Sequence, residues 1–271
     1  MNCNSSSVNV DALQTVSETL LITLYMRSLE TKRAKSIIQD YKSVEIVDRI
    51  NYNFSAYNSE LSQAVIAVRT EVIDRLVQDF IVRHPDATIV NLGAGLCTRF
   101  HRLNHDSINW INIDFPTVKS LWENLIGTSA RSQYLGHSIL DFAWIDKIKA
   151  MKSSQVLFIA EGVLMFLKES EVKQLINKIQ LNFPGSEMIF DSLGVFLAEK
   201  SNLNSGSLGI ETSYQWGIDN LKEIETWNDK VTLIDRCYYL DRHKTRLGWL
   251  GLFSCLPMVR KQVKIGHLRF G

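Results

Sequence analysis

Cysteine is scarce in this 271-residue chain: Cys3, Cys97, Cys237 and Cys255 are its four, and no two of them form a C-x-x-C pair. This spacing fits neither a zinc site nor a disulfide scaffold, so we expect reduced thiols in a cytoplasmic protein. The opening residues, MNCNSSSVNVD, lack a basic segment followed by an apolar one, and we expect no secretory signal. The six histidines show no spacing typical of metal ligands, and we expect no metal.

Proline, long apolar runs and an excess of one charge are also missing. The chain has four prolines, no internal repeats and no low-complexity linker. Its longest apolar runs, such as Val156–Ala160 and Gly162–Leu167, are far too short to span a bilayer. The formal net charge is +1, which gives no bulk attraction for nucleic acid or an anionic membrane, and we expect neither partner. With 45% hydrophobic and 22% charged residues, the composition is that of a globular protein.

The spacing of apolar residues changes at residue 87. Before it, apolar residues recur every three or four positions over 11–38 and 60–83, which predicts two helices. After it, short apolar runs alternate with amphipathic segments. The runs predict strands at 88–92, 109–113, 156–160, 187–191, 231–240 and 264–270, and the segments between them predict helices at 117–126, 142–151, 169–182 and 218–227.

This alternation predicts an α/β fold. Strands that alternate with helices form βαβ units and a parallel sheet covered on both faces. The last two strand-like runs leave little room for a periodic helix in 241–263, so we expect an antiparallel pair at the end of the sheet. We expect residues 1–85 to form a helical cap or lid on a core of residues 86–271, in one structural unit.

The stretch ATIVNLGAGLCTRFHRL, residues 87–103, places Gly93 and Gly95 where a predicted strand turns into a helix. Such a turn lets the backbone approach a ligand closely. A dinucleotide fingerprint would need a third glycine where this chain has Thr98. Asp114 lies 21 residues after Gly93, at the end of the next strand, where a carboxylate accepts hydrogen bonds from ribose hydroxyls. The pattern indicates an adenosine ligand without phosphates, commonly S-adenosylmethionine; the alternative is an ordinary turn, with Asp114 capping the following helix.

Several motifs in order carry a family resemblance. NLGAGLCTRFHRL, INIDFPTV and LFIAEGVLMFL resemble motifs of the leucine carboxyl methyltransferase-like family of S-adenosylmethionine-dependent enzymes. YQWGIDNLKEIETWNDKVTLID, RLGWLGLF and KIGHLRFG are similar to its bacterial branch, the O-methyltransferases of the tetracenomycin-polyketide type. The likeness runs from about residue 20 to the end. It implies a class I methyltransferase fold: a Rossmann-like three-layer sandwich with a mostly parallel seven-stranded sheet and an N-terminal helical cap.

The resemblance also implies roles for individual residues. Gly93 and Gly95 would lie under the cofactor, and Asp114 would hold its ribose. Arg69 would meet the methionine carboxylate, which suits a guanidinium because it forms bidentate charge-assisted pairs. From the residues alone, Arg69 would more simply extend into solvent along a buried stem. Glu161 matches the family acid after the fourth strand, near the cofactor and the methyl-transfer channel.

Three further motif positions depart from the family or match it ambiguously. The adenine contacts fall in HSILDFAW, which contains Ser138, Ile139 and Asp141. The family often has an acid at the position of Ser138, so the contact to the adenine amino group falls to Ser138, the backbone or Asp141. Cys97 stands where the family usually has an acidic residue. A basic family residue in the first helix has three possible matches: Arg27, Lys32 and Arg33.

We therefore expect an O-methyltransferase that acts on a carboxylate or hydroxyl of a small, polyketide-like secondary metabolite. An ionised carboxylate needs no general base, whereas a phenol or enol needs one within hydrogen-bond reach, with Glu161, His137 and Tyr214 as candidates. The Ser/Asn/Gly-rich segment 193–217 corresponds to the family lid over the acceptor. The alternatives are a methyltransferase for a peptide or protein carboxylate and an inactive cofactor-binding scaffold.

Overall fold

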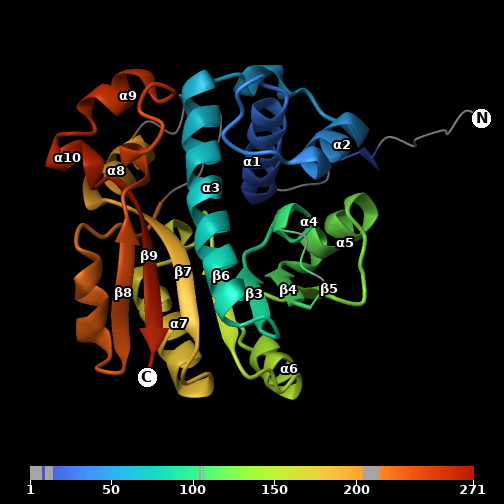
Figure 1. The fold of residues 1–271 in the computed structure, drawn as a ribbon, viewed down its shortest axis with the longest axis vertical. Helices are drawn as coiled ribbons and strands as arrows, with labels where there is room; N and C mark the ends of the chain where they lie inside the picture. The colour runs from blue at the N-terminus through green and yellow to red at the C-terminus, as the bar shows by residue number, and fades with distance from the viewer. Residues whose placement is uncertain (1–7, 10–14, 104, 106, 204–213) are drawn as a thin grey trace, which may run out of the picture.

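The computed structural model describes residues 8–9, 15–103, 105, 107–203 and 214–271. In this part of the chain a seven-stranded sheet forms the centre, in the order β5-β4-β3-β6-β7-β9-β8 (Figure 1). Its strands are β3 (Thr88–Leu92), β4 (Asn109–Asp114), β5 (Ser132–Gly136), β6 (Val156–Ala160), β7 (Glu187–Leu193), β8 (Val231–Cys237) and β9 (Val263–Phe270). Neighbours from β5 to β7 pair in parallel, and β9 pairs antiparallel with both β7 and β8. The predicted α/β fold and its antiparallel end are confirmed.

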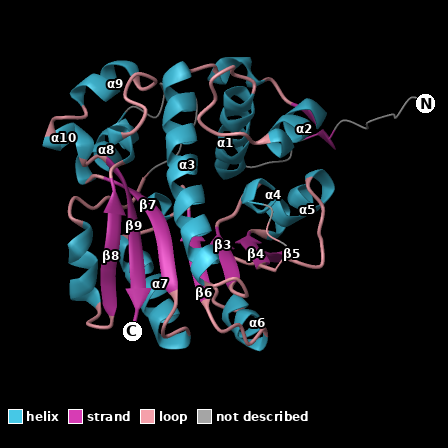
Figure 2. Cartoon of the chain, in the orientation of Figure 1, coloured by secondary structure: helices cyan, strands magenta, loops and turns pink. Residues whose placement is uncertain are grey.

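Helices cover both faces of this sheet (Figure 2). They are α1 (Thr15–Thr31), α2 (Tyr41–Arg49), α3 (Glu60–Arg83), α4 (Arg99–Leu103), α5 (Pro116–Leu125), α6 (Trp144–Ala150), α7 (Glu169–Asn182), α8 (Val195–Leu203), α9 (Gly248–Phe253) and α10 (Pro257–Arg260), with 3-10 turns η1 (Phe54–Tyr57), η2 (Leu164–Phe166), η3 (Leu221–Trp227) and η4 (Tyr239–Asp241). A short parallel pair joins β1 (Val8–Asn9) to β2 (Ile50–Asn51).

Each face of the sheet builds its own apolar core. Side chains alternate along a strand, so Ile89 packs under α3 on one face while Val90 packs toward α6 and α7 on the other. Because both faces are covered, the central strands β3 and β6 are buried at every position and are largely apolar, which is the pattern of a parallel sheet buried on two sides.

The N-terminal third divides between two positions. Helix α3 lies along one face of the sheet and forms part of the sandwich (Figure 1). Helices α1 and α2 instead join a third apolar cluster with α5, through side chains such as Leu24, Ile46 and Trp122. This places α1 beside the turn after β3. The division into a cap of residues 1–85 and a core of 86–271 stays a prediction.

Several segments differ from the sequence prediction, and no residue ranges were predicted for helices α2, α4 and α8. Strand β5 was missed because its sequence, SQYLG, is largely polar and lies at the sheet edge with few buried positions. The predicted α-helix at 218–227 is the 3-10 helix η3, and α9 and α10 occupy a region where no helix was predicted. The predicted helix over 11–38 ends at Thr31. Of the predicted lid, residues 204–213 lie outside the described residues.

Candidate active site

The turn between β3 and α4 requires glycine at two positions. Gly93 has φ +62° and Gly95 has φ +51°, a left-handed conformation that other residues rarely adopt. A Cβ on Gly93 would overlap Val163, and one on Gly95 would come within 2.6 Å of Leu20 Cδ2 on α1. The two glycines at the carboxyl end of β3 are therefore required by the left-handed turn and by the packing of Val163 and Leu20 against it.

Asp114 ends the neighbouring strand and is bound to this turn. Its Oδ2 accepts a hydrogen bond from the Gly95 N–H at 2.8 Å, and its Oδ1 accepts one from the Phe115 N–H at 2.8 Å. Burial raises the pKa of Asp114, and the two N–H donors oppose that rise. Each carboxylate oxygen keeps a further acceptor position, so the group fits a ribose diol.

The segment after β5 lies next to Asp114. The His137 N–H donates to the Asp114 carbonyl oxygen at 2.8 Å. Ser138 Oγ accepts from the backbone N–H two residues later, and Ile139 is buried in the core. Asp141 is exposed, and its Oδ2 lies 3.2 Å from His137 Nδ1. The segment predicted to contact adenine thus lies beside Asp114, the residue predicted to bind the ribose.

A cavity of about 330 Å³ opens from the glycine turn. This volume lies at the small end of the range, about 300–1,000 Å³, that is typical of small-molecule sites. Its wall combines charged and apolar side chains. The charged ones are Arg27, Arg69, Glu161 and Asp191, and the others include Val65, Cys97, Met165, Phe166, Leu193, Leu197, Tyr214, Tyr239 and Val263.

Three of the charged groups are paired with one another. Arg69 Nε on α3 lies 3.0 Å from Glu161 Oε1, and its Nη1 lies 3.1 Å from Asp191 Oδ2. The Gly162 N–H donates to Asp191 Oδ1 at 2.6 Å. Both acids stand at the carboxyl ends of adjacent parallel strands, which brings them to one edge of the sheet. Arg69 therefore points into the protein, and the alternative in which it extends into solvent is wrong.

Arg99, which the sequence pattern did not single out, holds the other oxygen of Glu161. Its Nη2 lies 2.6 Å from Glu161 Oε2, its Nε lies 2.5 Å from Asp74 Oδ1, and it is fully buried. Burial raises the pKa of Glu161, but the charges of Arg99 and Arg69 lower it more, so this pKa lies well below its usual range. Glu161 is ionised at neutral pH, with both oxygens paired. Arg99 lies within the glycine-turn motif NLGAGLCTRFHRL, and this position was the one sequence feature that could have marked it as a candidate site residue.

Asp191 and Tyr239 were also missed. Asp191 is a buried carboxylate inside a predicted apolar strand, and the cost of burying it was the available signal. Burial raises the pKa of Asp191 more than Arg69 lowers it. Burial likewise raises the pKa of Tyr239 and the pKa of Tyr214. The ring centroid of Tyr214 lies 5.2 Å from that of Phe166. Both phenols keep their protons at neutral pH.

The structure distinguishes the three cations of the N-terminal segment. Arg27 lines the cavity, where its Nε lies 2.9 Å from Asp40 Oδ2 and its Nη2 donates to the Leu96 carbonyl at 3.1 Å. Lys32 and Arg33 pair with acids at the surface instead. Arg27 is thus the member of the three that a ligand in the cavity would contact.

His137 is placed apart from the other predicted catalytic residues. Glu161 and Tyr214 line the cavity, together with Arg69 and the two glycines. The His137 ring instead lies between Asp141 and Lys147, with Nε2 2.9 Å from Lys147 Nζ. It is not among the residues that line the cavity.

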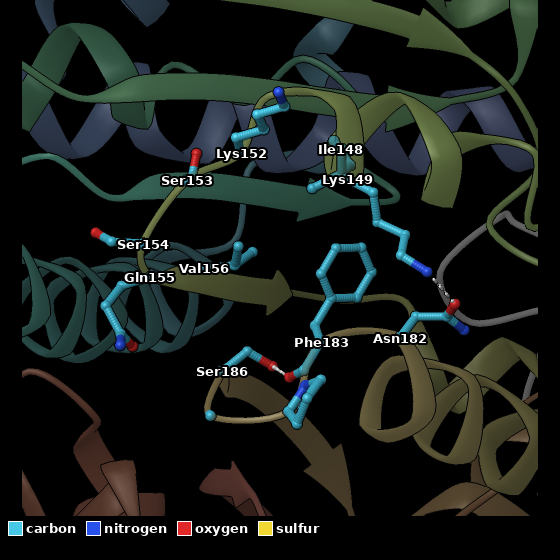
Figure 3. A pocket seen from close by; sticks show the side chains of 12 residues that line it. Ile148, Lys149, Lys152, Ser153, Ser154, Gln155, Val156, Asn182, Phe183 and Ser186 are labelled. Carbon is cyan, nitrogen blue, oxygen red and sulfur yellow. Dashed lines mark hydrogen bonds between the residues drawn. The ribbon is translucent and has the colours of Figure 1, made fainter.

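A second cavity, of about 270 Å³, lies at the amino ends of β6 and β7 (Figure 3). It surrounds the start of β6 at Val156 and the residue before β7, Ser186. Lys149 Nζ reaches Asn182 Oδ1 at 3.1 Å, and Ser186 Oγ donates to the Phe183 carbonyl. Ligands of open parallel sheets bind at the carboxyl ends of the strands, and none of the predicted site residues lies here.

Among the described residues, no group of three or more His, Cys, Asp or Glu side chains is arranged to hold a metal ion. Nor does any described helix combine the length and apolar character needed to cross a membrane.

The strand order and the glycine turn at the carboxyl end of β3 define the class I methyltransferase fold, and sequence comparison identifies the family. The leucine carboxyl methyltransferase family profile matches residues 7–180. The chain therefore belongs to this family. It is 26% identical over 254 residues to the tetracenomycin polyketide synthesis O-methyltransferase TcmP of Streptomyces glaucescens, covering 90% of this chain and 93% of the relative. It is 29% identical over 260 residues to the S-adenosyl-L-methionine-dependent methyltransferase dpfgK of Gibberella zeae, covering 87% of each.

Solved structures support the same fold. A DUF574 family protein from Streptomyces avermitilis aligns with a TM-score of 0.61 at 12% identity, over 95% of this chain and 100% of that one. The N-methyltransferase NodS of Bradyrhizobium japonicum, in complex with S-adenosyl-L-homocysteine, aligns with a TM-score of 0.50 at 10% identity, over 85% of this chain and 96% of that one. The chain is an S-adenosylmethionine-dependent methyltransferase. The bare glycine turn, the Asp114 carboxylate and the paired charges of the cavity fit this cofactor.

Proposed function

We propose that this enzyme is an O-methyltransferase whose acceptor is a small, partly apolar metabolite of the polyketide kind, methylated on a carboxylate or a hydroxyl. The observation that carries the proposal is the cavity at the Gly93 turn, in which paired charges and an apolar wall meet. The family match supports methyl transfer, and the similarity to TcmP supports an oxygen nucleophile on a small molecule.

The charged wall would hold the amino-acid part of the cofactor. Arg69 and Arg27 present guanidinium groups to a carboxylate, and Glu161 and Asp191 present carboxylates to an ammonium. Asp114 would accept hydrogen bonds from the ribose hydroxyls. When bound, the cofactor supplies an electrophilic methyl group and a neutral leaving group.

The adenine would lie over the segment after β5. Ser138 and the neighbouring backbone would line this side, and Ile139 supports it from the core. Asp141 lies on the same segment but is exposed and close to His137, so we assign it a weaker contact.

The apolar wall would align the acceptor and exclude water. Met165, Phe166, Leu193 and Leu197 supply a surface without charge beside the ionic group. Alignment of two reactants by such a wall lowers the barrier by up to about 7–11 kcal/mol without any proton transfer. The chain's contribution is orientation.

A carboxylate acceptor fits these residues better than a hydroxyl. Glu161 is a weak base because Arg99 and Arg69 pair both of its oxygens and hold its pKa low. Tyr214 keeps its proton at neutral pH, so its hydroxyl donates, and His137 lies outside the cavity lining. An ionised carboxylate needs none of the three, since its oxygen is already the nucleophile.

Methyl transfer from labelled cofactor to a panel of metabolites tests the proposal. We expect a labelled ester that mild alkali hydrolyses, with a rate that stays level from pH 6 to 9. A hydroxyl acceptor would give an alkali-stable ether and a rate that rises with pH. Label on nitrogen, carbon or sulfur, or on no metabolite, would overturn O-methylation.

A peptide or protein carboxylate is the second candidate acceptor, and the family match favours it. Intact-mass measurement of candidate peptides and of candidate metabolites separates the two, because only the true acceptor gains the mass of one methylene. An inactive scaffold is a third and weaker possibility. It predicts cofactor binding without turnover on any acceptor.

A further inference from the structure

The segment that carries α9 and α10 is apolar on both of its sides. Leu247, Gly251 and Ser254 are buried, and a Cβ on Gly251 would overlap the Lys244 carbonyl, so the helix is pressed against the preceding turn. Leu250 packs on the core from the same side. The helix therefore has a fixed inner face.

Its outer face would be expected to be polar, but it is not. Leu252 and Phe253 lie three and four residues after Trp249, and Leu256 lies four and three residues after them; the four side chains are 63% (Trp249), 72% (Leu252), 46% (Phe253) and 47% (Leu256) exposed. Met258 on α10 is 71% exposed. We call these five residues the α9 patch. An exposed apolar surface of this kind marks an interaction site.

The α9 patch is connected to the wall of the cavity by one side chain. Gln262 joins the two regions, because its Oε1 accepts from the Leu197 N–H at 3.0 Å and its Nε2 donates to the Met258 carbonyl at 2.9 Å. Leu197 lines the cavity, and the adjoining Phe196 on α8 is 54% exposed. Gln262 thus connects α10 to α8, the helix that carries Leu197 of the cavity wall.

The segment that carries the α9 patch has a net positive charge. Residues 242–264 contain six lysines and arginines and no aspartate or glutamate. Among the described residues, no ion pair engages Arg242, Lys244 or Lys261, while nearby Asp241 is bound by Arg260. Glu199 and Lys200 on α8 cancel each other. The formal net charge of the whole chain is only +1, because acidic residues elsewhere offset this segment, so the net charge did not indicate a local excess of positive charge.

We propose that the α9 patch docks on an anionic lipid surface. Trp, Phe and Leu at helical spacing, flanked by free cations, are the combination that inserts into the headgroup region of a charged bilayer. A second copy of this chain fits less well, because a two-fold contact through the patch would bring two positively charged segments together. The mouth of the cavity would then face the layer in which apolar acceptors concentrate.

Vesicle sedimentation of the full chain tests this proposal. With vesicles of phosphatidylglycerol and phosphatidylcholine in equal parts, we expect the protein to sediment, and far less of it to do so with phosphatidylcholine alone or at high salt. Leu252→Ser with Met258→Ser should reduce the bound fraction at least tenfold. Lys244→Glu with Lys261→Glu should do the same, because each pair removes one of the two attractions.

Matched controls remove equivalent groups elsewhere on the surface. Val82 and Leu181 are as exposed as Leu252, so Val82→Ser with Leu181→Ser should leave sedimentation unchanged. Lys222→Glu with Lys230→Glu is the corresponding charge control. Equal sedimentation with neutral and anionic vesicles, equal loss in patch and control variants, or a dimer in solution that Leu252→Ser and Met258→Ser dissociate would overturn the proposal. Cofactor affinity should be the same in all four variants.

Discussion

Arg69 and Glu161 stand 92 residues apart in the sequence, and their side chains meet at 3.0 Å between Nε and Oε1 in the wall of the cavity. Helix α3 carries one and the end of β6 carries the other, and Asp191 on β7 takes a second nitrogen of the guanidinium. None of these charges could be buried alone without a large cost. Together they form a set with alternating signs, to which an amino acid, itself of both signs, is complementary.

Replacement of Arg69 tests this complementarity. We expect Arg69→Ala to weaken S-adenosylmethionine binding at least tenfold, or about 1.4 kcal/mol, because a carboxylate would lose its charged partner. The free energy of unfolding should fall by about 3–5 kcal/mol, since Glu161 and Asp191 would remain buried with less compensation. Isothermal calorimetry and urea unfolding measure the two effects. Arg75→Ala, an exposed arginine on the same helix, should change neither.

Replacement of Asp114 tests the ribose contact. Asp114→Ala should weaken cofactor binding at least tenfold, about 1.4 kcal/mol, and Asp114→Asn should weaken it less, because an amide oxygen still accepts one hydrogen bond. Calorimetric titration with S-adenosylhomocysteine is the measurement. The control is Asp146→Asn on the surface of α6. Unchanged affinity in Asp114→Ala would remove the assignment.

Alanine variants of two glycines distinguish the effect of backbone strain on stability from an effect on cofactor binding. Gly95 and Gly127 both have positive φ, but a Cβ meets Leu20 at the first and nothing within 4 Å at the second. Each alanine variant should lose about 1 kcal/mol of stability from the left-handed conformation, and Gly95→Ala should lose more because its Cβ must displace Leu20. Cofactor affinity should fall with Gly95→Ala and stay constant with Gly127→Ala. Equal affinities in both variants would place the ligand away from this turn.

Asp40 predicts a specific acid dependence of stability. Burial raises its pKa, but Arg102, Arg27 and Thr98 together lower it from 3.8 to about 2. Because the folded pKa is the lower one, this stabilisation is complete above pH 3.8 and is lost as the pH falls toward 2. The shift corresponds to about 2 kcal/mol.

Urea unfolding of the wild type and of Asp40→Asn measures this loss. The variant should be about 3–5 kcal/mol less stable at pH 7, since two buried arginines lose their shared carboxylate. Its deficit should shrink below pH 4. The exposed pair of Lys32 with Asp48 gives a control, because Asp48→Asn should follow the wild type at every pH. A deficit for Asp40→Asn that does not change with pH would contradict the assignment.

The regular parts of the fold were predictable because their burial follows the chain's own periodicity. Strands β3 and β6 and helices α3 and α7 occupy the predicted residues, since each buries a continuous or a striped apolar set. Strand β5 was missed because pairing at the sheet edge, and not apolar pattern, makes it a strand.

The placement of the candidate site residues was predictable where motif and local chemistry coincide, as for Gly93 and Glu161, which line the cavity, and for Asp114, which binds the Gly95 N–H. Their roles in cofactor binding stay predictions. The placement was not predictable where a partner comes from a distant element. Nothing near Arg99 in the sequence indicates that its guanidinium reaches Glu161, 62 residues away. The same holds for Tyr239, which enters the cavity wall from the turn after β8.

A crystal structure with S-adenosylhomocysteine tests the central claim most directly. We predict that its amino-acid part lies between Arg27, Arg69 and Glu161, that its ribose hydroxyls bind Asp114, and that its sulfur faces the apolar wall. The product bound elsewhere, such as in the cavity at the amino ends of β6 and β7, or bound without contact to Asp114, would contradict the account.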